Sequence, residues 1–193
     1  MTKISVRRTA SSLHRDSPIR SGEPMELLDE IESLIRNGRH PIAIEQLKKV
    51  QPSKLPPKAF LRFCSLARRA GSPMLAVRAL NQRIHPSQRQ VGGTDDEKAE
   101  YAAALIAIGA VSEGIQLLQT IDGSKTPAAF LFRSFAHMNL WEYSAALPLL
   151  ESYVAHPALS PYEKLVGNVN LAGTEASLRR DGVAEQKPNA HIK

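Results

Sequence analysis

The sequence predicts an all-α protein made of about four antiparallel helix pairs that stack on one another, followed by a C-terminal capping helix. Three observations support this prediction. A pattern of glycine, small residue and leucine recurs along the chain, apolar residues around it follow helical spacing, and no stretch alternates between apolar and polar residues as a strand does.

The recurring pattern places a small residue five positions after a glycine and a leucine four positions later. Its first three copies are Gly38, Ala43 and Leu47; Gly71, Ala76 and Leu80; and Gly109, Gly114 and Leu118. In the fourth copy we expect Ala145 and Leu149, with Leu140 in place of the glycine. The small residues are 33, 38 and 31 positions apart, and a period near ~34 residues is typical of helical-hairpin repeats.

Local signals indicate where the helices begin and end. Prolines suited to a first helical turn stand at Pro24, Pro41, Pro73 and Pro161. Thr94, with Glu97 three residues later, forms the pattern of a capping box. Glycine at the end of the first helix of a pair supplies the backbone conformation of the turn, and a small residue early in the second helix lets the two helices approach closely.

The last predicted helix begins at Ser160-Pro161 and ends near Gly182. Its apolar residues form a single stripe of Tyr162, Leu165, Val169, Ala172 and Ala176. Because a repeat array leaves an apolar edge on its final unit, we expect this stripe to cover the fourth helix pair.

The domain organisation follows from this pattern. We expect a basic, disordered N-terminal arm over residues 1–22, a repeat domain over 23–182 and a polar, disordered tail over 183–193. The arm has no apolar segment, which excludes a secretory signal, although its Arg and Ser content loosely matches a transit peptide. The single cysteine, Cys64, cannot form an internal disulfide, and no run of ~18 apolar residues suggests a membrane span. A cytoplasmic location is therefore the expectation.

Charge is distributed unevenly along the chain. Residues 1–35 carry a net charge of −1, residues 36–93 carry +11 and residues 94–193 carry −4, from the counts of Lys, Arg, Asp and Glu. Such asymmetry is compatible with a basic surface that is only solvated, but it favours an acidic partner, and we expect Arg62, Arg68 and Arg69 to present part of the basic region to it.

The segment from Met138 to Pro157 resembles the second half of a tetratricopeptide repeat, and Cys64, Ala102, Tyr143, Ala145 and Pro157 match positions of that family's pattern. The resemblance covers about residues 24–178. It implies a right-handed α-solenoid whose concave surface, lined by the first helix of each pair, holds a peptide or a partner helix. Mapped onto this chain, the binding residues would be Leu61, Arg62, Ser65, Arg68, Arg69, Ala103, Ile106, Phe130, Ser134, His137 and Met138.

The sequence gives little support to an enzyme. Cys64 lies on an apolar helix face, which is typical of packing, and the His-Pro pairs lack the spacing of metal ligands. We expect no catalytic residue, metal or cofactor, and a non-enzymatic adaptor that binds a protein segment. Two alternatives stay open: a secretion or assembly chaperone that masks an amphipathic partner segment, and an RNA- or DNA-binding repeat protein that uses residues 36–93. A homodimer is also compatible with the sequence.

Overall fold

The computed structural model describes residues 24–85 and 92–185, which excludes the expected N-terminal arm and most of the expected tail. The described residues form nine α-helices, one short 3-10 helix over Pro52–Lys54 and no strand, which confirms the all-α prediction. The helices are α1 (Pro24–Arg36), α2 (His40–Lys49), α3 (Pro57–Arg69), α4 (Pro73–Ile84), α5 (Asp95–Ala107), α6 (Val111–Gln119), α7 (Ala128–Asn139), α8 (Tyr143–Val154) and α9 (Pro161–Glu185).

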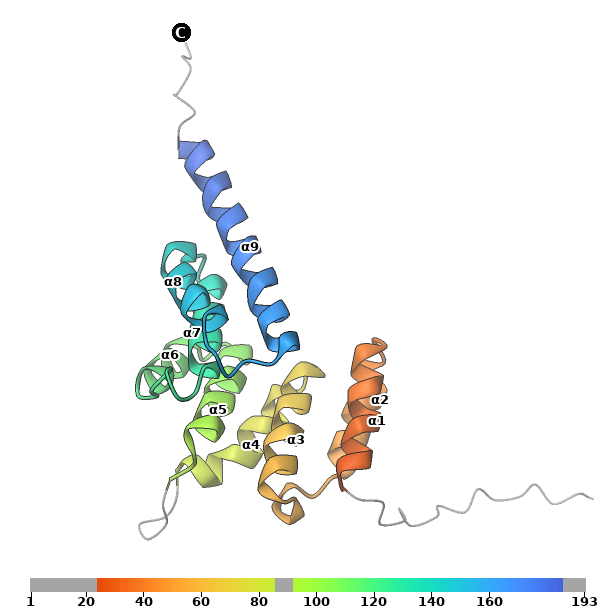
Figure 1. The fold of residues 1–193 in the computed structure, drawn as a ribbon. Helices are drawn as coiled ribbons and strands as arrows, with labels where there is room; N and C mark the ends of the chain where they lie inside the picture. Colours follow the sequence, from red (N-terminus) through yellow and green to blue (C-terminus); the bar gives the residue numbers. More distant parts are fainter. Residues whose placement is uncertain (1–23, 86–91, 186–193) are drawn as a thin grey trace, which may run out of the picture.

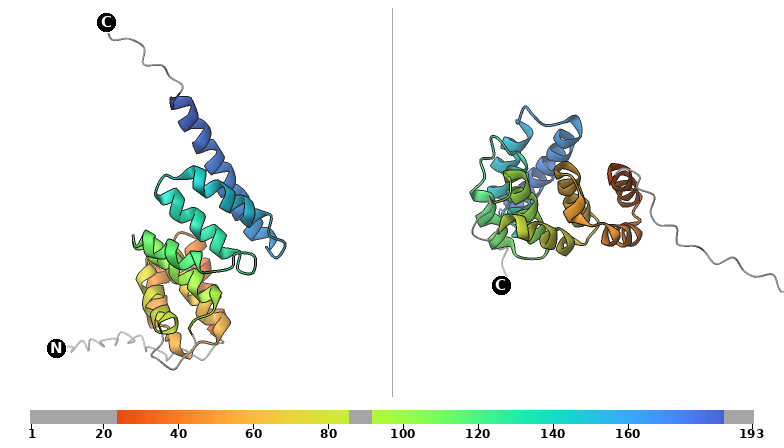
Figure 2. Two further views of the ribbon diagram at one scale, coloured as in Figure 1. Left: turned by 90° about the vertical axis from the view of Figure 1, so that its left-hand side faces the viewer. Right: turned by 90° about the horizontal axis from the view of Figure 1, so that it is seen from below.

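The first eight helices form four hairpins that pack in chain order. Each first helix packs on its own partner, and α1 with α3, α3 with α5 and α5 with α7 also contact one another. Helix α9 packs on α8. Figure 1 and the right-hand view of Figure 2 show α1 and α2 at one end of the molecule and α7 and α8 at the other.

The turns inside the four hairpins share one backbone conformation. Gly38, Gly71 and Gly109 have φ angles of 70°, 89° and 92°, in the left-handed region that glycine adopts without a steric penalty. In the fourth hairpin the equivalent residue is Trp141, with a φ of 62°. Residues other than glycine rarely adopt this backbone conformation. The sequence pattern therefore did not mark Trp141 as the turn residue, and the prediction placed the turn one position too early, at Leu140.

Counting from these left-handed residues corrects the register of the fourth repeat by one position. The small residue five positions after Trp141 is Ala146, and the leucine after it is Leu150. Both are fully buried, as are their counterparts in the other hairpins. The expected positions Ala145 and Leu149 are only partly buried. Seven positions before each left-handed residue stands another buried side chain, namely Ile31, Cys64, Ala102 and Ser134.

Close helix contact explains why the second helix needs a small residue. At Gly114, an added Cβ would lie 2.6 Å from Cγ1 of Ile106 and 3.0 Å from the backbone oxygen of Ala102. Helix α6 therefore touches the backbone of α5 at this point. The N-terminus of α5 is fixed by the expected capping box, in which Thr94 and Glu97 each accept a hydrogen bond from the other's backbone N–H.

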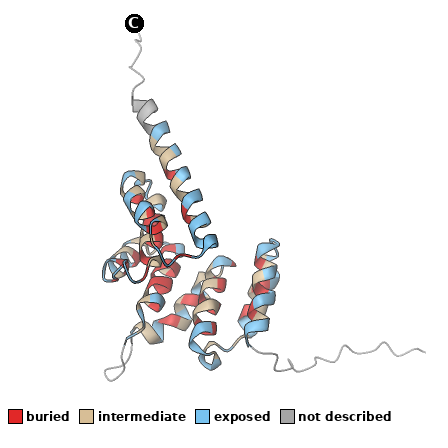
Figure 3. Ribbon diagram, viewed as in Figure 1, coloured by how far each residue is buried: buried red, intermediate tan, exposed pale blue. Residues whose placement is uncertain are grey.

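The apolar core divides into two clusters along the array. One joins α1 to α4 with part of α5, and the other joins α5 to α8 with part of α9. Figure 3 shows the buried residues between the helices and a largely exposed surface on α9.

Helix α9 begins at Pro161, as expected, but it continues to Glu185, beyond Gly182. Its orientation differs from the prediction, because Gly167 and Thr174 are buried while the expected stripe faces solvent. Close approach decides this orientation. An added Cβ on Gly167 would lie 2.6 Å from Cγ1 of Val154, so α9 approaches α8 with the face that carries Gly167, Leu171 and Thr174 and leaves the expected stripe outside.

Candidate functional site

A pocket of about 230 Å³ opens between the first helices of the second, third and fourth hairpins. It is lined by Arg68 of α3, by Ala103, Ile106 and Ala107 of α5, and by Phe132, Phe135 and Asn139 of α7. Three helices therefore contribute to one concave feature, whose lining includes three of the eleven residues predicted to bind a partner, namely Arg68, Ala103 and Ile106.

Helices α5 and α7 provide most of the apolar wall. Small side chains on α5, such as Ala103, leave room that the rings of Phe132 and Phe135 border from α7. These two rings lie 6.4 Å apart between centroids in a tilted arrangement. The wall is therefore held by side chains that also belong to the second core cluster.

Arg68 forms the charged side of the pocket, and its guanidinium is held from two directions. Its Nε and Nη2 donate to the two carboxylate oxygens of Glu100, at 2.7 and 3.2 Å. Its Cζ lies 4.9 Å from the centroid of the Phe132 ring, a cation–π contact. Glu100 is buried, and this burial raises the pKa of its carboxyl while the charge of Arg68 opposes the rise.

The two other arginines predicted for the site also face acids within the chain. Arg62 donates to Asp29 at 2.6 Å and to Glu32 at 2.7 Å, and Arg69 lies 3.2 Å from the same Glu32. The hydrogen bond from Arg62 and the nearby Arg69 lower the pKa of Glu32 to about 2. Acids of α1 and α5 therefore balance part of the positive charge of residues 36–93.

Seven of the predicted binding residues lie on α3 and α5, and three of these seven line the pocket. Leu61 and Ser65 are partly buried on α3. Ala103 and Ile106 line the pocket with little of their surface exposed. The pocket thus unites Arg68 with two of the residues predicted on α5.

The residues predicted on α7 do not line the pocket. The ring of Phe130 packs over Gly123. Ser134 is fully buried, and its hydroxyl donates to the backbone oxygen of Leu131. Nδ1 of His137 lies 2.7 Å from a carboxylate oxygen of Glu142.

Met138, the last of these predicted residues, faces α9, because its sulfur accepts a long hydrogen bond of 3.7 Å from the Thr174 hydroxyl.

The one-residue register error accounts for this difference at two of the four positions. Shifting Ser134 and Met138 by one position gives Phe135 and Asn139, both of which line the pocket. The signal that could have corrected the prediction was the pair Ala146 and Leu150, which fits the repeat when Trp141 takes the place of glycine. Phe132 and Ala107 carried no separate signal in the sequence.

The single cysteine is engaged in packing. Cys64 is fully buried, and burial raises the pKa of its thiol to about 12.

Across residues 24–85 and 92–185, no three His, Cys, Asp or Glu side chains gather closely enough to hold a metal ion. In the same ranges, no helix has both the length and the apolar character needed to cross a membrane.

Comparison with known proteins adds no family assignment, because no family model, curated protein or solved structure matches this chain. The resemblance to tetratricopeptide repeats therefore stays a prediction from the sequence.

Proposed function

We propose that this chain is a non-enzymatic adaptor, arranged as a right-handed α-solenoid, which binds a segment of a partner protein between α3, α5 and α7. The observation that carries the proposal is the open, largely apolar pocket shared by these three helices. Helices α3, α5 and α7 are the first helices of three successive hairpins, so a segment bound along them would cross these hairpins in order.

The size and lining of the pocket define the partner's chemistry. A volume of about 230 Å³ is below the ~300–1,000 Å³ common for small-molecule sites, and it suits one apolar side chain that anchors a peptide. Asn139 is exposed at the edge and offers amide donors and an acceptor to the peptide backbone. We therefore propose a segment with a large apolar anchor residue, rather than one recognised mainly by acidic groups.

The state of the arginines supports this emphasis on an apolar anchor. Arg62, Arg68 and Arg69 each form an ion pair inside the chain. A partner carboxylate would have to compete with Asp29, Glu32 or Glu100 for these groups. Burial of an apolar anchor has no such competitor and contributes roughly 25 cal/mol for each Å² removed from water.

Peptide selection against the whole chain tests the proposal. Peptides selected from a random displayed library should share a large apolar residue, and their affinity should fall at least tenfold for Ala107→Trp, which fills the pocket from an exposed position. Ala155→Trp, at an exposed alanine beyond the end of α8, is the matched control and should bind like the parent.

Two results would count against the proposal. One is that the selected peptides bind Ala107→Trp and the parent equally well. The other is that single-stranded RNA or duplex DNA binds more tightly than any peptide, with an affinity that falls steeply as salt rises from about 50 to 200 mM. That second result would favour the nucleic-acid alternative.

A further inference from the structure

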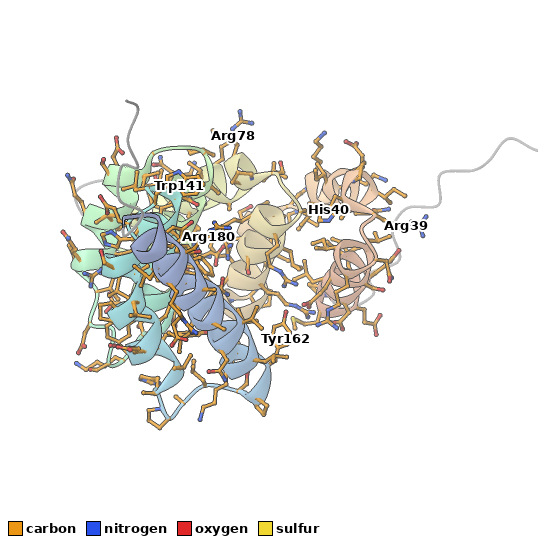
Figure 4. The ribbon with its side chains drawn as sticks, turned by 90° about the horizontal axis from the view of Figure 1, so that it is seen from above. Arg39, His40, Arg78, Trp141, Tyr162 and Arg180 are labelled. Atoms are coloured by element: carbon orange, nitrogen blue, oxygen red, sulfur yellow. The ribbon has the colours of Figure 1, made fainter. Side chains whose placement is uncertain are left out.

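The apolar row on α9 is exposed to solvent along its length. We call Tyr162, Leu165, Val169, Ala172 and Ala176 the α9 stripe. The three large side chains, Tyr162, Leu165 and Val169, are 64%, 60% and 64% exposed. Single exposed apolar residues are ordinary, but a continuous row of them marks an interaction surface. Figure 4 labels Tyr162 near one end of α9 and Arg180 near the other.

The spacing of the α9 stripe is that of a helix–helix seam. Its members are separated by three, four, three and four positions, which repeats every seven residues as in a coiled coil. At about 100° per residue, the middle of the stripe lies about 170° around the helix from the row of residues that packs toward the repeats. That packed row is Gly167, Leu171, Thr174 and Leu178. The stripe therefore points away from the hairpins that hold α9.

We propose that the α9 stripe pairs with the α9 stripe of a second copy of this chain, in antiparallel orientation. The reason is that the stripe complements itself. Its large residues all lie in the N-terminal half and its small residues in the C-terminal half. A twofold axis between Asn170 and Leu171 places Leu165 opposite Ala176 of the second copy, and Val169 opposite its Ala172.

The ends of the seam favour the same orientation. Antiparallel pairing brings Arg179 opposite the ring of Tyr162, where a guanidinium stabilises the pair through a cation–π contact. Arg179 forms an ion pair with Glu175 of the same helix at 3.2 Å, but its side chain is 78% exposed, and such an exposed pair holds the guanidinium only weakly. Parallel pairing would instead set Arg179 against its own copy. It would also place Leu165 against Leu165 and Ala172 against Ala172. Wide and narrow layers would then alternate along the seam, which prevents close packing.

The inference does not depend on the proposed function, because the stripe shares no residue with the pocket between α3, α5 and α7. If both hold, the dimer presents two pockets, and a partner with two anchor segments would bind more tightly than one with a single segment. The dimer test below requires no peptide, so either proposal can fail without the other.

Sedimentation equilibrium of the full chain over a concentration series tests dimer formation. We expect the mass to rise toward twice 21.2 kDa with increasing concentration. Leu165→Glu should remain a monomer with an unchanged far-ultraviolet spectrum, because this side chain is mostly exposed. Lys164→Glu, an exposed neighbour outside the stripe, is the control and should dimerise like the parent. A parent that stays monomeric up to about 1 mM, or a Leu165→Glu variant that dimerises normally, would overturn the proposal.

Disulfide trapping tests the orientation. Under mild oxidation, a mixture of Leu165→Cys and Ala176→Cys chains should form crosslinked dimers, whereas neither variant alone should do so. The native Cys64 is buried, and its raised thiol pKa keeps it unreactive, so the parent serves as the blank. Crosslinking of Leu165→Cys with itself, and not with Ala176→Cys, would refute the antiparallel arrangement.

Discussion

The ion pair between Arg68 and Glu100 connects the candidate pocket to the stability of the fold. Replacing Arg68 by Met keeps an unbranched side chain of similar length but leaves the carboxylate of Glu100 buried without its partner. Breaking a buried pair by removing one member costs about 3–5 kcal/mol. We therefore expect Arg68→Met to lower the free energy of unfolding substantially.

Protonation of Glu100 sets an upper bound to this loss. Keeping a carboxyl with an ordinary pKa of about 4.3 protonated costs about 1.36 kcal/mol for each pH unit above that pKa, which amounts to about 4 kcal/mol at pH 7. Loss of the contact with Phe132 adds about 0.5–1 kcal/mol. The expected loss at pH 7 is thus about 3.5–5 kcal/mol.

The pH dependence gives the prediction a definite sign. Burial already raises the pKa of Glu100 and Arg68 opposes that rise, so removing Arg68 raises the folded-state pKa further. The folded variant then binds more protons than its unfolded chain above pH 4.3, and its stability falls as the pH rises. The deficit against the parent should therefore be smaller at pH 5 than at pH 7.5.

Urea unfolding followed by circular dichroism measures these differences. Arg36→Met is the matched control, since Arg36 is 67% exposed and pairs with Glu32 within one helix, and it should cost less than about 0.5 kcal/mol. The double variant Arg68→Met, Glu100→Met should recover to within about 1 kcal/mol of the parent. If Arg68→Met costs no more than Arg36→Met, or the double variant is as unstable as the single one, the reasoning is wrong.

Three further predictions follow from single residues. Ion pairs with arginine lower the pKa of Glu32, so they stabilise the parent above pH 4.3 and are lost as the pH falls toward about 2. Glu32→Gln should remove this stability, and an acid titration should show that its free energy of unfolding depends less on pH than that of the parent. Gly114→Ala should destabilise the fold by about 1–2 kcal/mol despite better helix propensity, while Gly173→Ala, which meets no atom within 4 Å, should stabilise it. Trp141→Gly should raise the melting temperature, with a gain of about 0.5–1 kcal/mol, because it relieves a positive φ at a side chain that is 76% exposed.

Signals that act over one or two helical turns were sufficient to predict most helices. Proline at Pro24, Pro73 and Pro161 marks the first residue of a helix in the structure. The capping box at Thr94 depends only on residues within four positions of one another. Such features need no knowledge of distant contacts, and the hairpin order followed from their recurrence.

Features set by contacts between helices were not predictable in the same way. The positive charge of residues 36–93 suggested an open basic surface, but Arg68 meets Glu100 from a helix that begins after that segment. The face that α9 buries depends on where Gly167 lets Tyr153 and Val154 approach, and an apolar stripe alone does not reveal this. In both cases the deciding partner lies more than ten positions away in sequence.

The fourth hairpin shows how one residue decides a predicted site, and a pair of alanines tests the corrected register. Ala146 is fully buried at the position where Gly114 touches the preceding helix, whereas Ala145 is partly exposed. Ala146→Leu forces extra methylenes into a close helix contact and should cost about 1–3 kcal/mol, whereas Ala145→Leu should cost less than about 1 kcal/mol. Urea unfolding of the two variants side by side measures the difference. The reverse order would restore Ala145 as the packing residue and return Ser134 and Met138 to the partner-binding face.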